Sequence, residues 1–294
     1  LAVQVANGVV DVAVADEAEA VAVAKRYLAY FQGPVAPGPV PDQAALRDVV
    51  PEARKTVYEV RRAIEGLADE GSVLELRRGY GTAVVTALVR LAGRAVGVLA
   101  NDPAVLGGAV DAAAADKAAR FLQLCDGHDL PLLTLCDTPG FLVGPSAEEQ
   151  AQVRRFARLF VVGASLTVPL VTVVLRKGYG LGAQAMAGGG FHAPFFAVAW
   201  PTGEFGGMGL EGYVRLGFRK EMEAIADPVE RENYYKAKVA ELYANGKAVS
   251  IASVLEIDEV IDPADTRHWI MSGLRSVPKG EPRATRKRPC IDAW

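Results

Sequence analysis

The sequence predicts an α/β protein whose mainly parallel sheet is covered by helices on both faces. Apolar runs of strand length alternate with helical patterns through the middle of the 294-residue chain, which is typical of βαβ units. Hydrophobic residues make up 51% and charged residues 23%, a balance that predicts a sizeable buried core. The length allows one large domain or two small ones.

The N-terminal part predicts the end of a domain and a linker. "NGVVDVAVADEAEAVAVAKRYLAYF" reads as a short strand followed by an amphipathic helix, which is too small to fold alone. "GPVAPGPVPD" then has four prolines in ten residues, which exclude regular structure. We therefore expect the end of a domain over 1–32, a linker over 33–47, one domain over 48–276 and a basic tail over 277–294.

The remaining elements follow from periodicity. We expect a helix at 56–71 closed by Gly71, and two strands over 82–101 that turn at Ala92 and Gly93. Further along, the patterns predict helices at 110–129, 146–165 (with Ser146 as its cap), 182–188, 210–225, 227–246 and 262–274, and strands at 130–137, 168–175 and 193–200.

Composition argues against several classes of protein. A formal net charge of −3 gives no general footprint for nucleic acid, and the basic stretch 286–288 is expected to be a surface tail. Three widely spaced cysteines suit a reducing cytoplasm rather than a disulfide framework. No secretory signal is visible at the start of the sequence. The uncharged run 178–203 contains seven glycines and two prolines, so we expect a buried loop, helix and strand of a soluble protein rather than a membrane span.

The stretch "RKGYGLGAQAMAGGGF" (176–191) is the first candidate ligand loop. Its Gly178, Gly180 and Gly182 follow a predicted strand, but the spacing is not that of a dinucleotide fingerprint, and no acidic residue ends the next strand. A Walker loop is excluded because no Gly-Lys-Ser/Thr follows. The three histidines lie far apart without carboxylates at ligand spacing, so no metal site is predicted.

A second loop, "CDTPGFLVG" (136–144), follows another buried strand. In a parallel sheet both loops lie at the carboxyl edge, where ligands commonly bind. Glycine lets the backbone approach a ligand closely, and the helix beginning near Gly182 adds a partial positive charge. Together the loops predict an anion-stabilising pocket of main-chain N–H groups, that is, an oxyanion hole.

Several stretches in collinear order resemble the carboxyltransferase (β) subunits of biotin-dependent acyl-CoA carboxylases. They are "LCDTPGFLVG", "VPLVTVVLRKGYGLGAQAM", "AWPTGEFGGMGLEGYVRLGFRKE" and "IDEVIDPADTRHWI". The resemblance implies the crotonase-like ββα superhelix of the C-terminal half of that family, with 1–32 as the tail of a missing N-terminal half. It implies carboxyl transfer from carboxybiotin to the α carbon of an acyl-CoA. Biotin is then the cofactor, and no metal is implied in this chain.

The resemblance also implies partners and site residues. The partners are a biotin carboxylase, a biotin carboxyl carrier protein and the N-terminal half, in a cytoplasmic homo- or hetero-oligomer based on dimers, up to a hexamer, without nucleic acid or membrane. The family's motif assigns the biotin-side oxyanion hole to the N–H groups of Gly182 and Ala183. Biotin or substrate would be contacted by Gly140, Phe141, Leu142, Gly180, Leu181 and Ala185. Ala185 matches the position that lines the acyl pocket, and its small size leaves room for an acyl group larger than propionyl.

The sequence departs from the best-known members of the family near the loops. Val143 replaces a proline, and Leu181 and Gln184 stand where glycine and tyrosine are common; none of these changes removes a main-chain donor. Two alternatives stay open. A stand-alone crotonase-type hydratase or decarboxylase would need an acid or base, and Asp137 and Glu204 are the nearby candidates, although the expected roles are a loop cap and a backbone contact. A non-catalytic assembly subunit would not bind free biotin.

Overall fold

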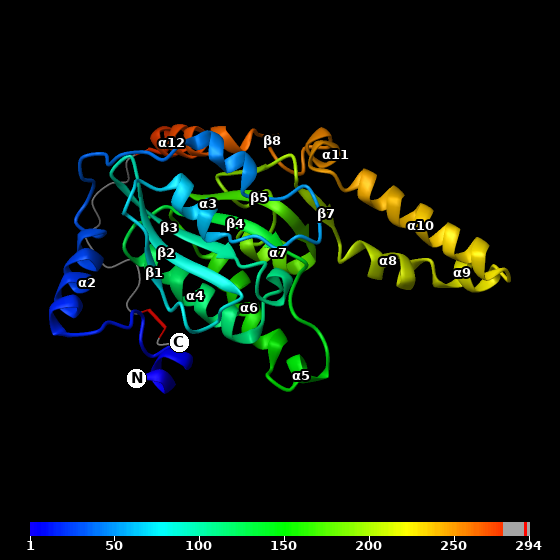
Figure 1. Cartoon of the computed structure of the whole chain (residues 1–294), viewed down its shortest axis with the longest axis horizontal. Helices are drawn as coiled ribbons and strands as arrows, with labels where there is room; N and C mark the ends of the chain where they lie inside the picture. The colour runs from blue at the N-terminus through cyan, green and yellow to red at the C-terminus, as the bar shows by residue number, and fades with distance from the viewer. Residues whose placement is uncertain (279–290, 293–294) are drawn as a thin grey trace.

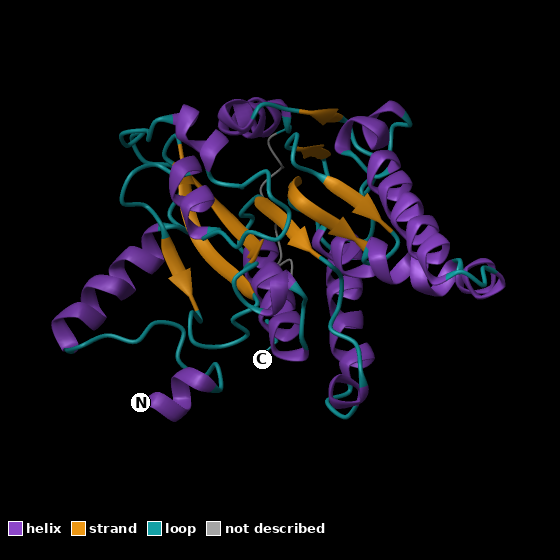
Figure 2. Cartoon of the chain, turned by 45° about the vertical axis from the view of Figure 1, so that its right-hand side comes forward, coloured by secondary structure: helices purple, strands orange, loops and turns teal. Residues whose placement is uncertain are grey.

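The computed structural model describes residues 1–278 and 291–292, and Figures 1 and 2 show its α/β architecture. Most of the basic tail over 277–294 therefore lies outside the described residues. In chain order the helices and strands are α1 (Ala2–Ala6), α2 (Glu17–Ala29), η1 (Gln43–Asp48), α3 (Arg61–Leu67), β1 (Leu74–Leu76), β2 (Val84–Leu91), β3 (Arg94–Asn101), η2 (Leu106–Gly108), α4 (Ala112–Gly127), β4 (Leu132–Thr138), α5 (Pro145–Glu148), α6 (Gln152–Ala164), β5 (Leu170–Tyr179), α7 (Gly180–Met186), β6 (Phe196–Ala199), β7 (Glu204–Gly206), α8 (Leu210–Gly217), α9 (Arg219–Ala224), α10 (Pro228–Asn245), α11 (Ala248–Ser253), β8 (Glu259–Val260), η3 (Pro263–Asp265) and α12 (Thr266–Ser276).

The described strands form one sheet in the order β1-β2-β3-β4-β5-β6-β8. β7 also pairs with β5, further along that strand than β6 does. The β1–β2 and β2–β3 pairs are antiparallel, and every later pair is parallel. β2 and β3 turn at Ala92 and Gly93, which both have positive φ (50° and 78°), as a tight two-residue hairpin requires. The predicted hairpin and the mainly parallel sheet are confirmed.

Side chains of the central strands alternate between two apolar layers. Val84 and Leu88 of β2 pack on the side of α4, α6 and α7, while Val85 and Val89 pack on the side of α3 and α12. Figure 1 shows α3 and α12 above the sheet and α4 and α6 below it. Burial on both faces explains why the strands read as continuous apolar runs rather than as alternating ones.

Two expectations for the N-terminal third are wrong in detail. The short strand before α2 does not form in the described chain; this segment meets the sheet edge through a 2.7 Å hydrogen bond from the Arg77 N–H to the Asp11 carbonyl. The helix expected at 56–71 covers only α3. It ends before Gly71 because Asp69 turns inward, where its carboxylate accepts the N–H groups of Ala92 (2.9 Å) and Gly93 (2.7 Å).

Residues 33–42 contain no helix or strand, as the four prolines predict, and η1 follows them. This segment lies against the sheet, since the Val35 N–H donates to the Gly93 carbonyl (3.1 Å). The division of the chain into tail, linker and domain stays a prediction.

The helix expected at 146–165 is two helices. α5 begins at Pro145 after Gly144 (φ 126°), and Ala151 in the left-handed region (φ 54°) separates it from α6. Ser146 therefore lies inside α5 and does not cap it. Likewise the helix expected at 210–225 divides at Phe218 into α8 and α9.

Helices α8, α9 and α10 project from the body as an arm (Figures 1 and 2). α10 has 18 residues, none of them buried, and its Tyr243 hydroxyl donates to Glu211 of α8 (2.9 Å). Among the described residues, no helix has the length and apolar character needed to cross a membrane.

Candidate functional site

The two glycine loops are in direct contact at the carboxyl ends of β4 and β5. A Cβ atom placed on Gly182 would lie 2.6 Å from the Gly140 carbonyl carbon and 3.0 Å from the Phe141 nitrogen, so only glycine fits there. Gly140 and Gly180 both have positive φ, 123° and 57°. The structure thus brings Gly140 and Phe141 together with Gly180 and Gly182, although the two loops are about 40 residues apart in the sequence. The order of the predicted strands placed both loops at the same edge of the sheet.

The "PGF" loop is fixed by its own neighbours. The Gly140 N–H donates to the Thr138 hydroxyl (3.1 Å), and the Gly140 carbonyl accepts the Val110 N–H (3.1 Å). Phe141 stacks on Phe156 of α6 with ring centroids 4.0 Å apart. The loop therefore presents a rigid backbone to α7.

α7 contributes main-chain N–H groups at its first turn. The N–H groups of Gly180, Leu181 and Gly182 have no acceptor inside the helix, because they precede its first i to i−4 bond, and the Ala183 N–H is the first that can make such a bond. Gly182 and Ala183 are buried, whereas Leu181 is 56% exposed. The donors thus lie just beneath the surface, beside an exposed residue of the same turn.

The other proposed contact residues have different surroundings. Leu142 is half-buried beside Phe141. Ala185 is buried (1% exposed) in the apolar layer beneath α7. Its side chain therefore packs inside this chain rather than on its surface.

A cavity of about 990 Å³ opens beside the loops, at the ends of β4, β5 and β6. Pro139 and Tyr179, which directly precede Gly140 and Gly180, line it. Five basic residues (Arg54, Lys55, Arg176, Lys177 and Lys247) and three acidic ones (Glu52, Glu204 and Glu211) line it as well. The sequence reasoning missed these basic residues. Arg176 and Lys177 stand next to the glycine motif, a signal that could have been used, but Arg54 comes from a distant segment with no motif.

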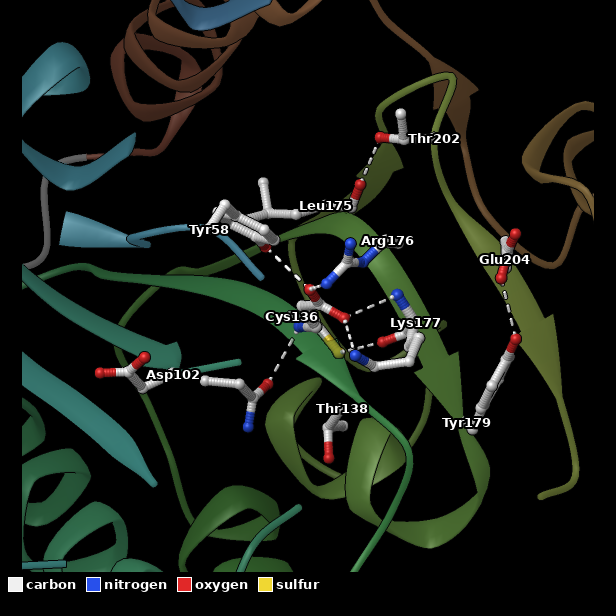
Figure 3. Close-up of polar contacts among 12 residues, drawn as sticks. Tyr58, Asp102, Cys136, Thr138, Leu175, Arg176, Lys177, Tyr179, Thr202 and Glu204 are labelled. Atoms are coloured by element: carbon white, nitrogen blue, oxygen red, sulfur yellow. Dashed lines mark hydrogen bonds and ion pairs between the residues drawn. The ribbon is translucent and has the colours of Figure 1, made fainter. Parts of the chain in front are cut away.

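Asp137 is a buried centre of four interactions rather than a loop cap. Its carboxylate accepts the Tyr58 hydroxyl (2.9 Å) and the Lys177 N–H (3.1 Å), and it pairs with the Arg176 guanidinium (3.2 Å) and the Lys177 ammonium (2.9 Å). Figure 3 shows the side chains of Tyr58, Arg176 and Lys177 close together beside Cys136. The loop itself is capped by Thr138. Burial, and secondly the charge of Asp137, raise the pKa of Tyr58.

Glu204 also differs from its expected backbone contact. Its carboxylate pairs with Arg54 and accepts the Tyr179 hydroxyl (3.0 Å; Figure 3). Burial, and secondly the charge of Glu204, raise the pKa of Tyr179. Both acids are thus held by cations and hydroxyls, which favours structural roles over the general acid or base that a stand-alone crotonase-type enzyme needs.

Within residues 1–278 and 291–292, no group of three or more His, Cys, Asp or Glu residues could hold a metal ion. Residues 138–144 and 178–187 of the two loops contain no acidic side chain. Their donors are N–H groups at the start of α7, which suit an oxygen atom that carries negative charge.

Comparison with known proteins identifies the family. The family model described as the carboxyl transferase domain matches residues 2–290. The methylmalonyl-CoA carboxyltransferase 12S subunit of Propionibacterium freudenreichii subsp. shermanii is 42% identical over 231 residues, 78% of this chain and 43% of that protein. The propionyl-CoA carboxylase beta chain of Roseobacter denitrificans is 35% identical over 92% of this chain and 54% of its own length.

Solved structures agree. A single-chain, multi-domain long-chain acyl-CoA carboxylase is 57% identical with a TM-score of 0.86, over 92% of this chain and 27% of that one. The hexameric transcarboxylase 12S structure with methylmalonyl-CoA and methylmalonic acid bound is 38% identical with a TM-score of 0.78, over 88% of this chain and 49% of that one. The predicted crotonase-like α/β fold is confirmed. The chain spans about half the length of the curated relatives it matches, and it belongs to the carboxyl transferase domain family.

Proposed function

We propose that the chain is the C-terminal half of the carboxyltransferase of a biotin-dependent acyl-CoA carboxylase. The reaction moves the carboxyl group of carboxybiotin to the α carbon of an acyl-CoA. The observation that carries the proposal is the contact of Gly140 and Phe141 with Gly182, in a chain that belongs to this family. This contact concentrates main-chain donors at one point of the sheet edge.

The N–H group of Gly182, which has no acceptor within α7, holds the ureido oxygen of biotin, and the N–H group of Ala183, the next residue of the same turn, is its second donor. Bound biotin supplies the carboxyl group and, once it has lost it, a basic ureido nitrogen. Because both donors are screened from bulk water, hydrogen bonds to a charged oxygen are stronger there than at the surface. Gly140 and Phe141 keep the first turn of α7 in place, and the exposed Leu181 marks the side of approach. One donor of this kind is typically worth about 3–4 kcal/mol of transition-state stabilisation.

The preferred substrate is an acyl-CoA with a chain longer than propionyl. Two observations support this: the residue at the family's acyl-pocket position is as small as alanine (Ala185), and the 57% identical relative is a long-chain acyl-CoA carboxylase. The test is the ratio of kcat/KM for palmitoyl-CoA to that for acetyl-CoA. Ala185→Ile should lower this ratio about tenfold or more, because the larger side chain would displace methylene groups of the long acyl chain from an apolar pocket.

Ala119→Ile is the matched control, since Ala119 is equally buried but lies on α4. It adds the same bulk to the core and should leave the ratio unchanged. An unchanged ratio in Ala185→Ile would refute the assignment of Ala185 to the acyl pocket.

The partners that this function requires are an N-terminal crotonase-like half, a biotin carboxylase and a biotin carboxyl carrier protein, in the cytoplasm. Assembly in dimer-based oligomers, up to a hexamer, is consistent with the hexamer of the 12S relative.

The deciding experiment measures acyl-CoA carboxylation by the purified chain with and without a matching N-terminal half, in the presence of carboxylase and biotinylated carrier. Activity that requires the N-terminal half supports the proposal. Absence of activity in every combination, together with no binding of free biotin, contradicts it and favours an assembly subunit.

A further inference from the structure

The strand ends that lead into the two glycine loops are out of register with each other. Cys136 of β4 pairs with Val174 of β5, but the next pair is Thr138 with Gly178, so β5 uses four residues where β4 uses two. The extra residues of β5 form a bulge over 175–177. A bulge re-aims the chain that follows it, and here the chain that follows is the loop into α7.

Asp137 fills this bulge. It lies opposite 175–177, is 0% exposed, and accepts the N–H group of Lys177 (3.1 Å), a donor displaced from the regular ladder. The side chains of Arg176 (3.2 Å) and Lys177 (2.9 Å) close on the same carboxylate. One side chain thus binds the backbone and both cations of the bulge.

Asp137 is itself held from the side away from β5. Tyr58 donates to its second carboxylate oxygen (2.9 Å), and Asn101 accepts its backbone N–H (3.1 Å). Its carbonyl oxygen lies against Gly108, where an added Cβ would be only 2.1 Å away. Asp137 is therefore fixed by contacts outside the bulge as well as within it.

The position of Asp137 along the chain links both loops. It stands three residues before Gly140, and Lys177 stands three residues before Gly180. Thr202 pins the other end of the bulge, because its hydroxyl donates to the Leu175 carbonyl (2.6 Å; Figure 3).

We propose that Asp137 is a positioning residue whose carboxylate sets the β5 bulge and so holds the Gly140 and Gly182 loops at their contact distance. The catalytic part of this inference rests on the proposed carboxyl transfer; the structural part does not. Asp137 does not touch the substrate, since both carboxylate oxygens are occupied and the residue is fully buried.

The test compares Asp137→Asn with Asp69→Asn. Asp69 is also a buried carboxylate (3% exposed). It accepts three backbone N–H groups, those of Gly38, Ala92 and Gly93, and pairs with Arg267. It lies at the β2–β3 turn, which is the opposite edge of the sheet from the glycine loops. Both variants lose one buried charge without loss of volume, so they separate positioning of the loops from general stability.

The first readout is hydrogen exchange of peptides covering 138–144 and 178–187. In Asp137→Asn exchange should quicken about tenfold or more in both peptides, because a lost charged hydrogen bond shifts local opening by that order. In Asp69→Asn both peptides should keep the wild-type rate. Unchanged exchange in Asp137→Asn, or equal acceleration in the two variants, overturns the proposal.

The second readout is carboxylation by the chain assembled with its N-terminal half. Asp137→Asn should lower kcat about 100-fold with KM for the acyl-CoA within about threefold, since loops displaced by about 1 Å lose transition-state contacts more than binding. A rise in KM at unchanged kcat overturns the positioning role.

Thr202→Val is a milder variant for the case that Asp137→Asn does not fold. It removes the second pin and should quicken exchange in 178–187 while leaving 138–144 unchanged; no change in 178–187 counts against the bulge as the coupling element. If the wild-type assembly carboxylates no acyl-CoA, the proposed function fails, and the exchange result alone decides whether Asp137 positions the loops.

Discussion

Replacing Gly182 by alanine tests whether the contact between the two loops matters. The new Cβ atom would lie 2.6 Å from the Gly140 carbonyl carbon and 2.7 Å from its Cα, whereas ordinary contacts begin at 3.4 Å. The loops must therefore separate by about 0.8 Å, and the atoms in the way are backbone atoms that cannot rotate aside. Overpacking of this kind costs about 1–3 kcal/mol.

The sign of the stability change is diagnostic. Gly182 lies inside α7, where intrinsic helix propensity favours alanine over glycine by about 1 kcal/mol. Without the contact, Gly182→Ala would therefore be more stable than the wild type. With the contact, we expect a less stable protein and a kcat lower by about 100-fold, because a misplacement near 1 Å costs about that much.

Thermal unfolding and the reconstituted carboxylation assay measure both effects. Gly190→Ala is the control, since a Cβ there would meet no atom within 4 Å and its φ is not positive. It should match the wild type in melting temperature and kcat. A Gly182→Ala protein with raised stability and kcat within about twofold of wild type would refute the loop-contact reasoning.

Three further predictions concern other buried groups. Burial lowers the pKa of Lys117 from 10.5 to about 8; the folded state then holds a disfavoured charge below pH 8, so the free energy of unfolding should rise between pH 8 and 10.5 by roughly 3 kcal/mol, and urea titrations of Lys117→Met should lack this rise. Arg54→Met leaves the largely buried Glu204 carboxylate without its cation and should cost about 1–2 kcal/mol in the same titrations, whereas a loss below about 0.3 kcal/mol would show that the pair contributes little. Burial raises the pKa of both Cys125 and Cys136, so iodoacetamide should label neither in the folded protein, as peptide mapping by mass spectrometry can check.

The parts of the site made of main chain could be predicted from sequence. Closely spaced glycines after a buried strand predict a turn at which other backbone atoms come close. Because both loops lie at the same edge of the sheet, the contact at Gly182 could be expected. The hairpin at Ala92 and Gly93 was predictable for the same reason, because a two-residue turn has few solutions.

The side-chain clusters could not be predicted in this way. Tyr58 contacts Asp137 although the two residues are 79 positions apart in the sequence. The bulge in β5 opposite Asp137 leaves no periodic pattern in the sequence. β7 and β8, with three and two residues, are too short for a pattern of period two to register. The break at Ala151 depends on a left-handed residue that the surrounding helix propensity hides.

The projecting arm of α8, α9 and α10 should unfold locally at a lower free energy than the rest of the molecule. With no buried residue in α9 or α10, little apolar burial ties these two helices to the body. Tyr243 of α10 contacts Glu211 within the arm, and the Arg54 guanidinium of the body lies 3.7 Å from the centroid of the Tyr243 ring. Such a segment opens locally at a free energy well below that of global unfolding. A protease added to the isolated chain should therefore cut first near 225–227, between α9 and α10, while the sheet and both glycine loops stay folded.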